Sequence, residues 1–497
     1  MNPMRRAVLF ATAILLAAPA ASAATAGDVA SGMPLDLASA IRTTLANNQT
    51  IKVQAYYPRI DQANLLNAYG AFDPALTFNR SYAVENEPTL ALGGPIVPSQ
   101  IKTDYYSLGL TGLMPWGLTY NVGGNATNTR GTDYAFNNDY ITFGGVNLTQ
   151  PLLRGFGLAA NLVNVRVARA NHSIDEWNFR LILIQTVTNV ITDYNALVLA
   201  HKELETEVHG RDLAETLLRQ NIEEVKIGYM ARSEVTTARA QVAAYDGPIV
   251  TAQYNVRAAD NALWQLMGET SFPPTRAPLV VSRPDVPDVT IDAEKDLQEA
   301  LNKNPEYQAA RLGIKINRAK LAAARNGLLP QVNLIASYGY NGNDQDFAAS
   351  RRQVWSEKYP SSAIEASVSV PIFNASARGT ARAARLTEEQ SEENLGLLEG
   401  TIALAVANAA ANIDATRKEV SAYRVAYDLA NTAMEDEEKK LRDGTSTTLA
   451  VQQAQQSLIS VETSLAAAMA AASNAVAYYD EDIGRTLDRY HIDVAGR

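Results

Sequence analysis

The sequence predicts a membrane β-barrel joined to long α-helical coiled-coil columns, with the plan duplicated inside one chain. Three observations predict this fold class. Runs of about ten residues alternate between apolar and polar side chains, which is the length and pattern of a tilted membrane strand. The stretches 152–227 and 372–442 contain no proline and favour very long helices. The same order of landmarks also occurs in both halves of the chain.

The N-terminus has the pattern of a secretory signal peptide. Arg5 and Arg6 precede a short apolar stretch, and small residues at Ala23 and Ala26 complete two candidate cleavage sites. A buried N-terminal helix is the alternative. Cleavage would remove two basic residues and no acidic one, which changes the formal net charge from −10 to −12. We therefore expect an exported bacterial protein.

The duplication sets the domain boundaries. Leu45-Ala-Asn-Asn-Gln49 in the first half resembles Leu301-Asn-Lys-Asn-Pro305 in the second, and each precedes a helix-favouring segment. Five prolines between residues 273 and 287 indicate a linker between the halves. The predicted parts are the signal peptide (1–26), a first repeat (27–266, with strands in 74–150, a long helix, a turn near 228 and a return helix), the linker (267–292), a second repeat (293–486, with strands in 331–371 and a turn near 444) and a tail (487–497).

The helices are expected to pair as long columns. A helix over 152–227 would be roughly 110 Å long at a rise of about 1.5 Å per residue. Two shorter helices placed end to end would match each long one, with a kink at Gly247-Pro248. Apolar residues at alternating spacings of three and four predict coiled-coil packing. This seam comprises Val187, Val190, Tyr194, Leu197, His201, Leu204 and Val208. We interpret His201 as a seam residue rather than a metal ligand.

Four strand-like runs precede the first long helix, and two more lie between residues 331 and 371. In the second run, Leu108 and Leu110 alternate with Gly109 and Thr111, which separates an apolar from a polar face. We expect a bulge at Gly144-Gly145. A soluble β-sandwich is the alternative. Four to six strands cannot close a barrel with an aqueous lumen, so several chains must pool their strands; three chains with four strands each would make twelve.

Composition excludes several function classes. The chain has no cysteine and only four histidines, which leaves little material for a thiolate or imidazole metal site. Its acidic balance argues against nucleic-acid binding. No P-loop, GxSxG, HExxH or dinucleotide fingerprint occurs. No transmembrane helix is expected after the signal peptide. We therefore expect no enzyme activity, no catalytic residues, no cofactor and no metal.

The chain resembles the TolC-type outer-membrane efflux proteins, also called outer membrane factors, over about residues 35–486. The resemblance rests on the repeated halves and on the motifs 148–157 (LTQPLLRGFG), 227–235 (IGYMARSEV) and 441–449 (LRDGTSTTL). It implies a homotrimer in the outer-membrane lipid, with a barrel completed by trimerisation and a periplasmic extension in which the helices form a coiled-coil tunnel. It also implies a periplasmic adaptor (membrane fusion) protein and an inner-membrane pump or ABC exporter as partners. The implied function is a passive exit duct of a tripartite efflux or type I secretion system. An exported structural coiled-coil protein without a transport role is the alternative.

The resemblance also implies where the functional residues lie. The tip that docks the adaptor would be formed by the two helix turns: Gly228, Tyr229, Arg232, Gly444, Thr445 and Ser446. Glu234 and Asp443 are the candidate tip carboxylates, and ordinary solvated helix ends are the alternative for both. The junctions between barrel and helices would lie at Pro74, Pro151, Pro330 and Pro371. The chain departs from the family by an extra strand pair around residues 113–117, which either enlarges the barrel or lies outside it.

Overall fold

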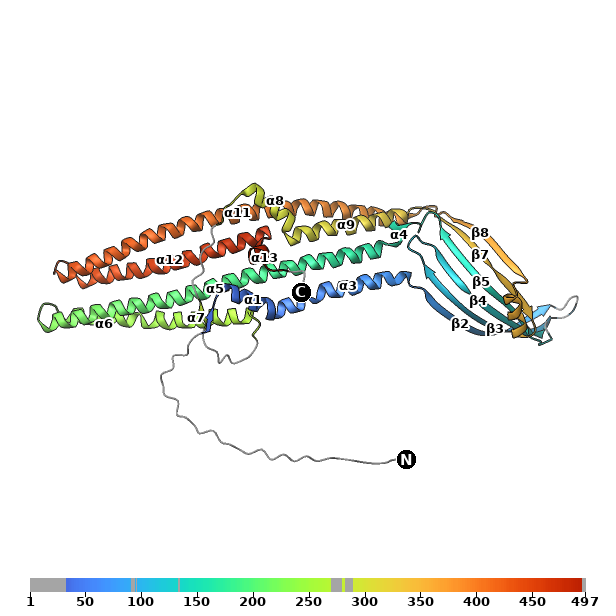
Figure 1. Cartoon of the computed structure of the whole chain (residues 1–497), viewed down its shortest axis with the longest axis horizontal. Coiled ribbons are helices and arrows are strands. Elements are labelled where there is room, and N and C mark those ends of the chain that lie inside the picture. The colour runs from blue at the N-terminus through green and yellow to red at the C-terminus, as the bar shows by residue number, and fades with distance from the viewer. Residues whose placement is uncertain are drawn as a thin grey trace, which may run out of the picture.

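The computed structural model describes residues 33–90, 94, 96–132, 135–269, 279–281 and 289–493. Figure 1 shows an elongated molecule with one sheet at one end and helical columns that extend from it. The predicted signal peptide and the five linker prolines lie outside the described residues.

Six strands form one antiparallel sheet in the order β2-β3-β4-β5-β7-β8. The first half of the chain supplies four of them and the second half two, as the alternation predicted. The expectation of twelve strands assumed four strands per chain. The added pair had been left open, and the structure places it within the sheet of the single chain, because β3 and β4 pair with each other and with β2 and β5. The strands are β2 (Ala75–Leu90), β3 (Ile96–Leu113), β4 (Thr119–Gly131), β5 (Asp139–Pro151), β7 (Gln331–Asp344) and β8 (Pro360–Ser369).

The register places apolar side chains on one face of the sheet. Leu76 pairs with Leu110, which pairs with Val122, and the row continues through Val146 to Tyr338. Residues directly opposite each other point to the same side, so this row is apolar across five strands.

The predicted bulge at Gly144-Gly145 is absent. Both glycines occupy regular pairs with β4 and β7. Their role is steric, since a Cβ on Gly145 would lie 2.4 Å from the carbonyl oxygen of Tyr338 and 2.7 Å from the ring of Phe143. Glycine therefore permits close packing on the sheet without a change of register.

The first long helix, α5 (Val163–Lys226), begins later than the predicted residue 152. Gly155 and Gly157 adopt φ values of +85° and +90°, which interrupt any helix there. The side chain of Asn161 donates hydrogen bonds to both glycine carbonyls at 2.8 and 2.9 Å. The short helix α4 (Leu158–Asn161) follows this turn. In the second half, α11 (Ala375–Arg442) begins after Asn374, at a φ of 44°.

Shorter helices pack along each long one, end to end, as predicted (Figure 1). Along α5 these are α1 (Leu37–Asn47), α2 (Gln49–Gln54), α3 (Tyr56–Tyr69), α6 (Arg232–Ala244) and α7 (Asp246–Leu266). The helix break between α6 and α7 falls next to the predicted kink at Gly247-Pro248. Along α11 these are α9 (Pro305–Asn326) and α12 (Thr448–Ile483). A 3-10 turn, η1 (Gly70–Phe72), links α3 to β2.

The repeated motif near residues 48 and 304 joins the stacked helices. Asn48 caps α2 by accepting from the amide of Ile51, and its side-chain amide donates to the carbonyl of Leu266 at the end of α7 (2.8 Å). Asn304 caps α9 in the same way, and its amide lies 3.5 Å from the carbonyl of Asp482 near the end of α12. In each half, one asparagine therefore caps the helix that follows it and also hydrogen-bonds the end of the helix stacked against that one.

Two predicted boundaries need correction. Residues of the expected linker form β6 (Leu279–Val281), which pairs in parallel with β1 (Met33–Leu35). Leu279 is fully buried there, so apolar burial fixes this part of the linker. The expected tail begins inside α13 (Thr486–Arg489), where Leu487 is fully buried. With α8 (Ala293–Lys303), these elements surround the middle of the columns, where the two largest buried clusters lie.

Two described helices, α5 and α11, are long and apolar enough to cross a membrane by length and composition alone. The sequence had led us to expect none. Of the most apolar window, 56% is buried in α5 but only 17% in α11. The first value is typical of a core helix. The apolar stretch of α11 is mostly exposed on the single chain, and its exposed residues include Leu397 and Leu404.

Candidate functional site

Both helix reversals lie at the end of the columns farthest from the sheet (Figure 1). The first follows α5. Gly228 has a φ of +84°, its amide donates to the carbonyl of Val225, and the amide of Tyr229 donates to the carbonyl of Glu224 (2.9 Å). This is a Schellman cap, in which a left-handed glycine lets the last helical carbonyls find donors. Arg232 then begins α6.

The second reversal repeats this geometry. Gly444 has a φ of +74°, and the amide of Thr445 donates to the carbonyl of Lys440 (2.9 Å). The hydroxyl of Ser446 donates to Glu437 at 2.5 Å. Thr447 caps α12 by accepting from the amide of Ala450. The second turn is therefore fastened by side chains as well as by the backbone.

The structure brings the two turns together. The hydroxyl of Thr448 lies 3.9 Å from the sulfur of Met230, although the two residues are far apart in the sequence. The side chain of Tyr229 is 83% exposed beside this contact. In the part of the chain that the structure describes, Glu234 and Asp443 form no ion pair. Both are therefore carboxylates available to solvent or to another molecule.

The four prolines predicted at the barrel junctions lie at strand ends. Pro74 directly precedes β2 and Pro330 directly precedes β7. Pro151 is the last residue of β5, and Pro371 follows β8 after one residue. The turn between β3 and β4 also lies at the junction between strands and helices, because the carbonyl of Trp116 accepts a hydrogen bond from the amide of Gly157 (3.0 Å).

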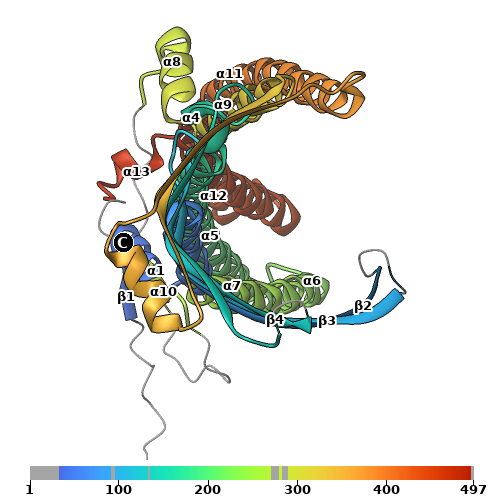
Figure 2. The ribbon, with the colours of Figure 1, turned by 90° about the vertical axis from the view of Figure 1, so that its right-hand side faces the viewer.

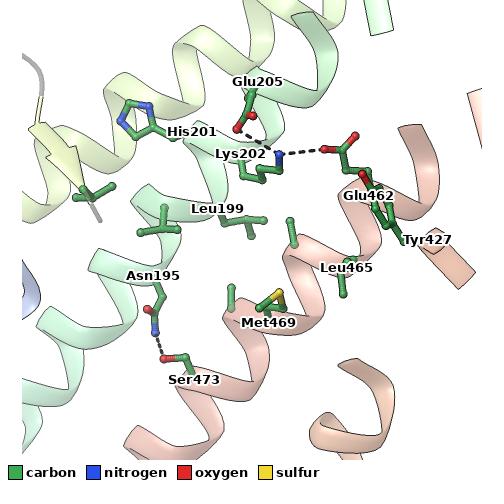
Figure 3. A pocket seen from close by; sticks show the side chains of 14 residues that line it. Asn195, Leu199, His201, Lys202, Glu205, Tyr427, Glu462, Leu465, Met469 and Ser473 are labelled. Atoms are coloured by element: carbon green, nitrogen blue, oxygen red, sulfur yellow. Dashed lines mark hydrogen bonds and ion pairs between the residues drawn. The ribbon is translucent and has the colours of Figure 1, made fainter. Parts of the chain in front are cut away.

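A cavity of about 500 Å³ lies between α5 and α12, midway along the columns. Figure 3 shows Lys202 reaching from α5 toward Glu462 on α12 and toward Glu205 on its own helix. The Lys202 nitrogen lies 2.9 Å from Glu462 and 3.2 Å from Glu205. At the other end of the cavity, the amide of Asn195 donates to Ser473 at 2.9 Å. These polar contacts join the first half of the chain to the second.

The seam predicted through His201 holds only in part. Val187, Val190, Tyr194 and Leu197 are at most 1% exposed. His201 lies beside β6 instead, where its Nε2 is 3.2 Å from the carbonyl oxygen of Leu279.

A second polar cluster fixes α8, α12 and α13. Asp296 accepts from the hydroxyl of Tyr479 and from Arg485 (2.7 Å), and Arg485 also pairs with Glu299 (2.8 Å). Burial alone would raise the pKa of Asp296, but the hydrogen bonds from Tyr479, the backbone of Asp292 and Arg485 hold this pKa below its usual value. Asp296 is therefore held as a carboxylate.

Sequence reasoning missed these contacts between distant residues. Lys202, Glu462 and Asp296 each resemble ordinary solvated helix positions in the sequence. Only the packing of helices from both halves reveals their partners. The described residues contain no group of three His, Asp or Glu side chains arranged to hold a metal ion.

Comparison with known proteins identifies the family. The model of the outer membrane efflux protein family matches residues 115–269 and 297–478. The chain is 26% identical to the outer membrane protein TolC of Escherichia coli (strain K12) over 355 residues, which is 68% of this chain and 70% of that protein. The fold is similar to the outer-membrane channel OprN (TM-score 0.67, 16% identity, 90% of this chain and 89% of that chain). It is also similar to the CmeC outer membrane channel of Campylobacter jejuni (TM-score 0.65, 14% identity, 93% and 90%). The chain therefore belongs to the outer membrane efflux protein family, whose members are outer-membrane channels rather than enzymes.

Proposed function

We propose that this protein is a passive exit duct that spans the outer membrane and the periplasm as a homotrimer. It would serve a tripartite efflux or type I secretion system. The observation that carries this proposal is the shape of one chain. It combines an open six-stranded sheet with one apolar face and two helix reversals at the opposite end of the molecule.

The two free edges of the sheet favour assembly in the membrane. β2 and β8 each pair on one side only. A strand edge without hydrogen-bond partners is not viable in hydrocarbon, so β2 of one chain would pair with β8 of the next. Three chains with six strands each would supply eighteen strands, within the range of outer-membrane barrels.

The faces of the sheet fit a water-filled duct in lipid. Large apolar side chains on one face are exposed in the single chain: Leu76, Phe78, Leu108, Leu110, Val122, Tyr338, Ile364 and Val368. The opposite face carries Thr77, Asn79 and Asn121. An apolar outer face and a polar inner face are the pattern of a membrane barrel.

The tip would dock the periplasmic adaptor, which links the duct to an inner-membrane pump or ABC exporter. Two Schellman turns would present a rigid surface, on which every residue except the half-buried Ser446 is exposed: Gly228, Tyr229, Arg232, Gly444, Thr445 and Ser446. Repeated three times, they would surround one opening. The carboxylates of Glu234 and Asp443 would make that opening favour cations.

Disulfide cross-linking tests the assembly, because the natural chain has no cysteine. Thr77→Cys on β2 would be combined in turn with a cysteine on the same face of β8, at Ser361, Ala363, Glu365 or Ser367. At least one pair should form cross-linked trimers under oxidation. The control joins Thr77→Cys to Asn147→Cys in the middle of the sheet, which should remain uncross-linked.

The same preparation separates the proposal from its alternative. The duct should require detergent for solubility, have the mass of three chains and conduct ions in a planar bilayer. A chain that is soluble without detergent, forms no β2–β8 cross-link and conducts nothing would instead be an exported structural coiled-coil protein.

A further inference from the structure

A groove lies between the short helix α10 (Phe347–Trp355) and the apolar face of the sheet. Figure 2 shows α10 on the convex side of the curved sheet. The groove has a volume of about 560 Å³, which is within the range of ligand pockets. Its walls are mostly apolar and include Phe78, Leu108, Val122, Phe347 and Trp355.

Small residues make the floor of this groove. Gly124 and Gly144 pair directly across β4 and β5, and Ala126 lies two residues further along β4. A Cβ on Gly144 would lie 2.9 Å from a methyl carbon of Val354 on α10. Glycine at position 144 therefore lets Val354 of α10 pack directly against the sheet, beside the small residues of the floor.

The helix is fastened at one end of the groove. The hydroxyl of Ser350 donates to the carbonyl of Tyr140 and lies 2.8 Å from the hydroxyl of Thr142. The ring of Phe347 packs on the ring of Tyr140 with centroids 5.7 Å apart. Ser350 is fully buried by these contacts. These contacts hold α10 in place, so one wall of the groove is a fixed helix.

Arg351 brings a positive charge to this apolar site. It lines the groove, and no residue within the described ranges forms an ion pair with it. The nearby carboxylate of Glu357 also lines the groove, where it accepts from the hydroxyl of Tyr340 at 3.2 Å. On β2, Arg80 stacks over the ring of Tyr106 at 5.4 Å. Arg351 is thus a cation beside an apolar cavity, available to an anionic group.

We propose that the groove binds a phosphorylated membrane lipid, with one acyl chain on the glycine floor and a phosphate on Arg351. The inference rests on the proposed contact between the apolar face and lipid. The groove is continuous with that face, and guanidinium groups recognise phosphate through paired hydrogen bonds. An arginine that lines an apolar groove can hold the phosphate of a lipid while the acyl chain lies against the apolar walls.

The position of the groove defines the source of the lipid. α10 joins β7 to β8 at the strand ends remote from the helical columns. The columns extend into the periplasm, so this end faces the outer leaflet. The ligand is therefore a phosphorylated glycolipid of the outer leaflet rather than free phosphate.

Native mass spectrometry of the detergent-solubilised trimer tests this site. The probe is an acylated glucosamine disaccharide bearing two phosphates, compared with the same lipid without phosphates and with inorganic phosphate alone. Arg351→Glu should weaken binding of the phosphorylated lipid by about tenfold or more. Arg352→Glu is the matched control, because Arg352 is the next residue on α10 and does not line the groove. It should leave binding unchanged.

A second variant tests the acyl site independently. Ala126→Leu adds bulk to the floor and should reduce binding of both lipids, with or without phosphates. Equal binding by the Arg351→Glu and Arg352→Glu proteins would overturn the headgroup assignment. Unchanged lipid binding in Ala126→Leu would overturn the acyl assignment.

Trimer mass and conductance, measured on the same samples, separate this inference from the proposed function. A conducting trimer that binds no lipid refutes only the lipid site. A protein that forms no trimer refutes the duct itself.

Discussion

Substituting arginine at neighbouring positions of β3 tests which face of the sheet meets lipid. Leu110 lies in the apolar row between Leu76 and Val122 and is 40% exposed in the single chain. Thr111 is the next residue and points to the opposite face, where its hydroxyl lies 3.4 Å from the carbonyl of Ala75. The two sites share a strand and a depth, so they differ mainly in the environment that each side chain meets.

The strand geometry gives the expected magnitude. Leu110 is three residues from Leu113, the last residue of β3 at the end nearest the helices. A rise of about 3.3 Å per residue and a tilt of about 40° place it about 8 Å from that end. Arginine on the lipid face costs about 2–4 kcal/mol at the midplane of an apolar band about 25 Å tall, and about 0–1 kcal/mol at its border. We therefore expect Leu110→Arg to cost about 2 kcal/mol per chain.

The assay is guanidinium unfolding of protein refolded into phospholipid vesicles, with the folded fraction read from heat-modifiable gel mobility. Leu110→Arg should shift the unfolding midpoint to lower denaturant. Thr111→Arg should shift it by less than half as much, because its guanidinium would meet water in the lumen. Equal shifts at both sites, or a larger shift for Thr111→Arg, would refute the assignment of the two faces.

Three further outcomes are expected. Asp296→Asn should destabilise the folded chain by about 1–3 kcal/mol near neutral pH in denaturant titrations. The lowered pKa of Asp296 means that its stabilisation is present above about pH 4 and is lost as pH falls through the folded-state pKa, so the difference from wild type should shrink in acid. Gly444→Val should impair adaptor-dependent export while trimers still form, because valine is strained at a φ of +74°. Gly396→Ala, inside α11 with open space around it, should leave export unchanged. Replacing Glu234 and Asp443 by alanine should reduce the cation preference measured as a reversal potential; an unchanged potential would mean that both are solvated helix ends.

The sequence predicted the elements whose signals are local. Alternation located all six strands, and Gly228 and Gly444 indicated the reversals, because only a left-handed residue satisfies a Schellman cap with ease. The repeated Asn48 and Asn304 were visible as a motif, but their role at the joints between stacked helices was not.

The missed features depend on packing between distant segments. The start of α5 was misplaced because Gly155 and Gly157 act together with Asn161. The pairing of Lys202 with Glu462 needs two helices from different halves to lie side by side. β6 was hidden among prolines, and only burial of Leu279 against α5 distinguishes it from a linker.

The extra β3–β4 pair would affect the path through the proposed duct. Each chain contributes four columns, formed by α5, α11 and the two stacked pairs, but six strands. Barrel diameter grows roughly in proportion to strand number, so eighteen strands would enclose a wider lumen than twelve. The turn at Trp116 hydrogen-bonds to Gly157 beside the start of α4, so the added strands meet the helices at the junction instead of standing apart from them. If the barrel is wider but the number of helical columns is unchanged, the resistance to flow would lie in the helical tunnel. The narrowest point would then be the tip, where the turns at Gly228 and Gly444 would converge.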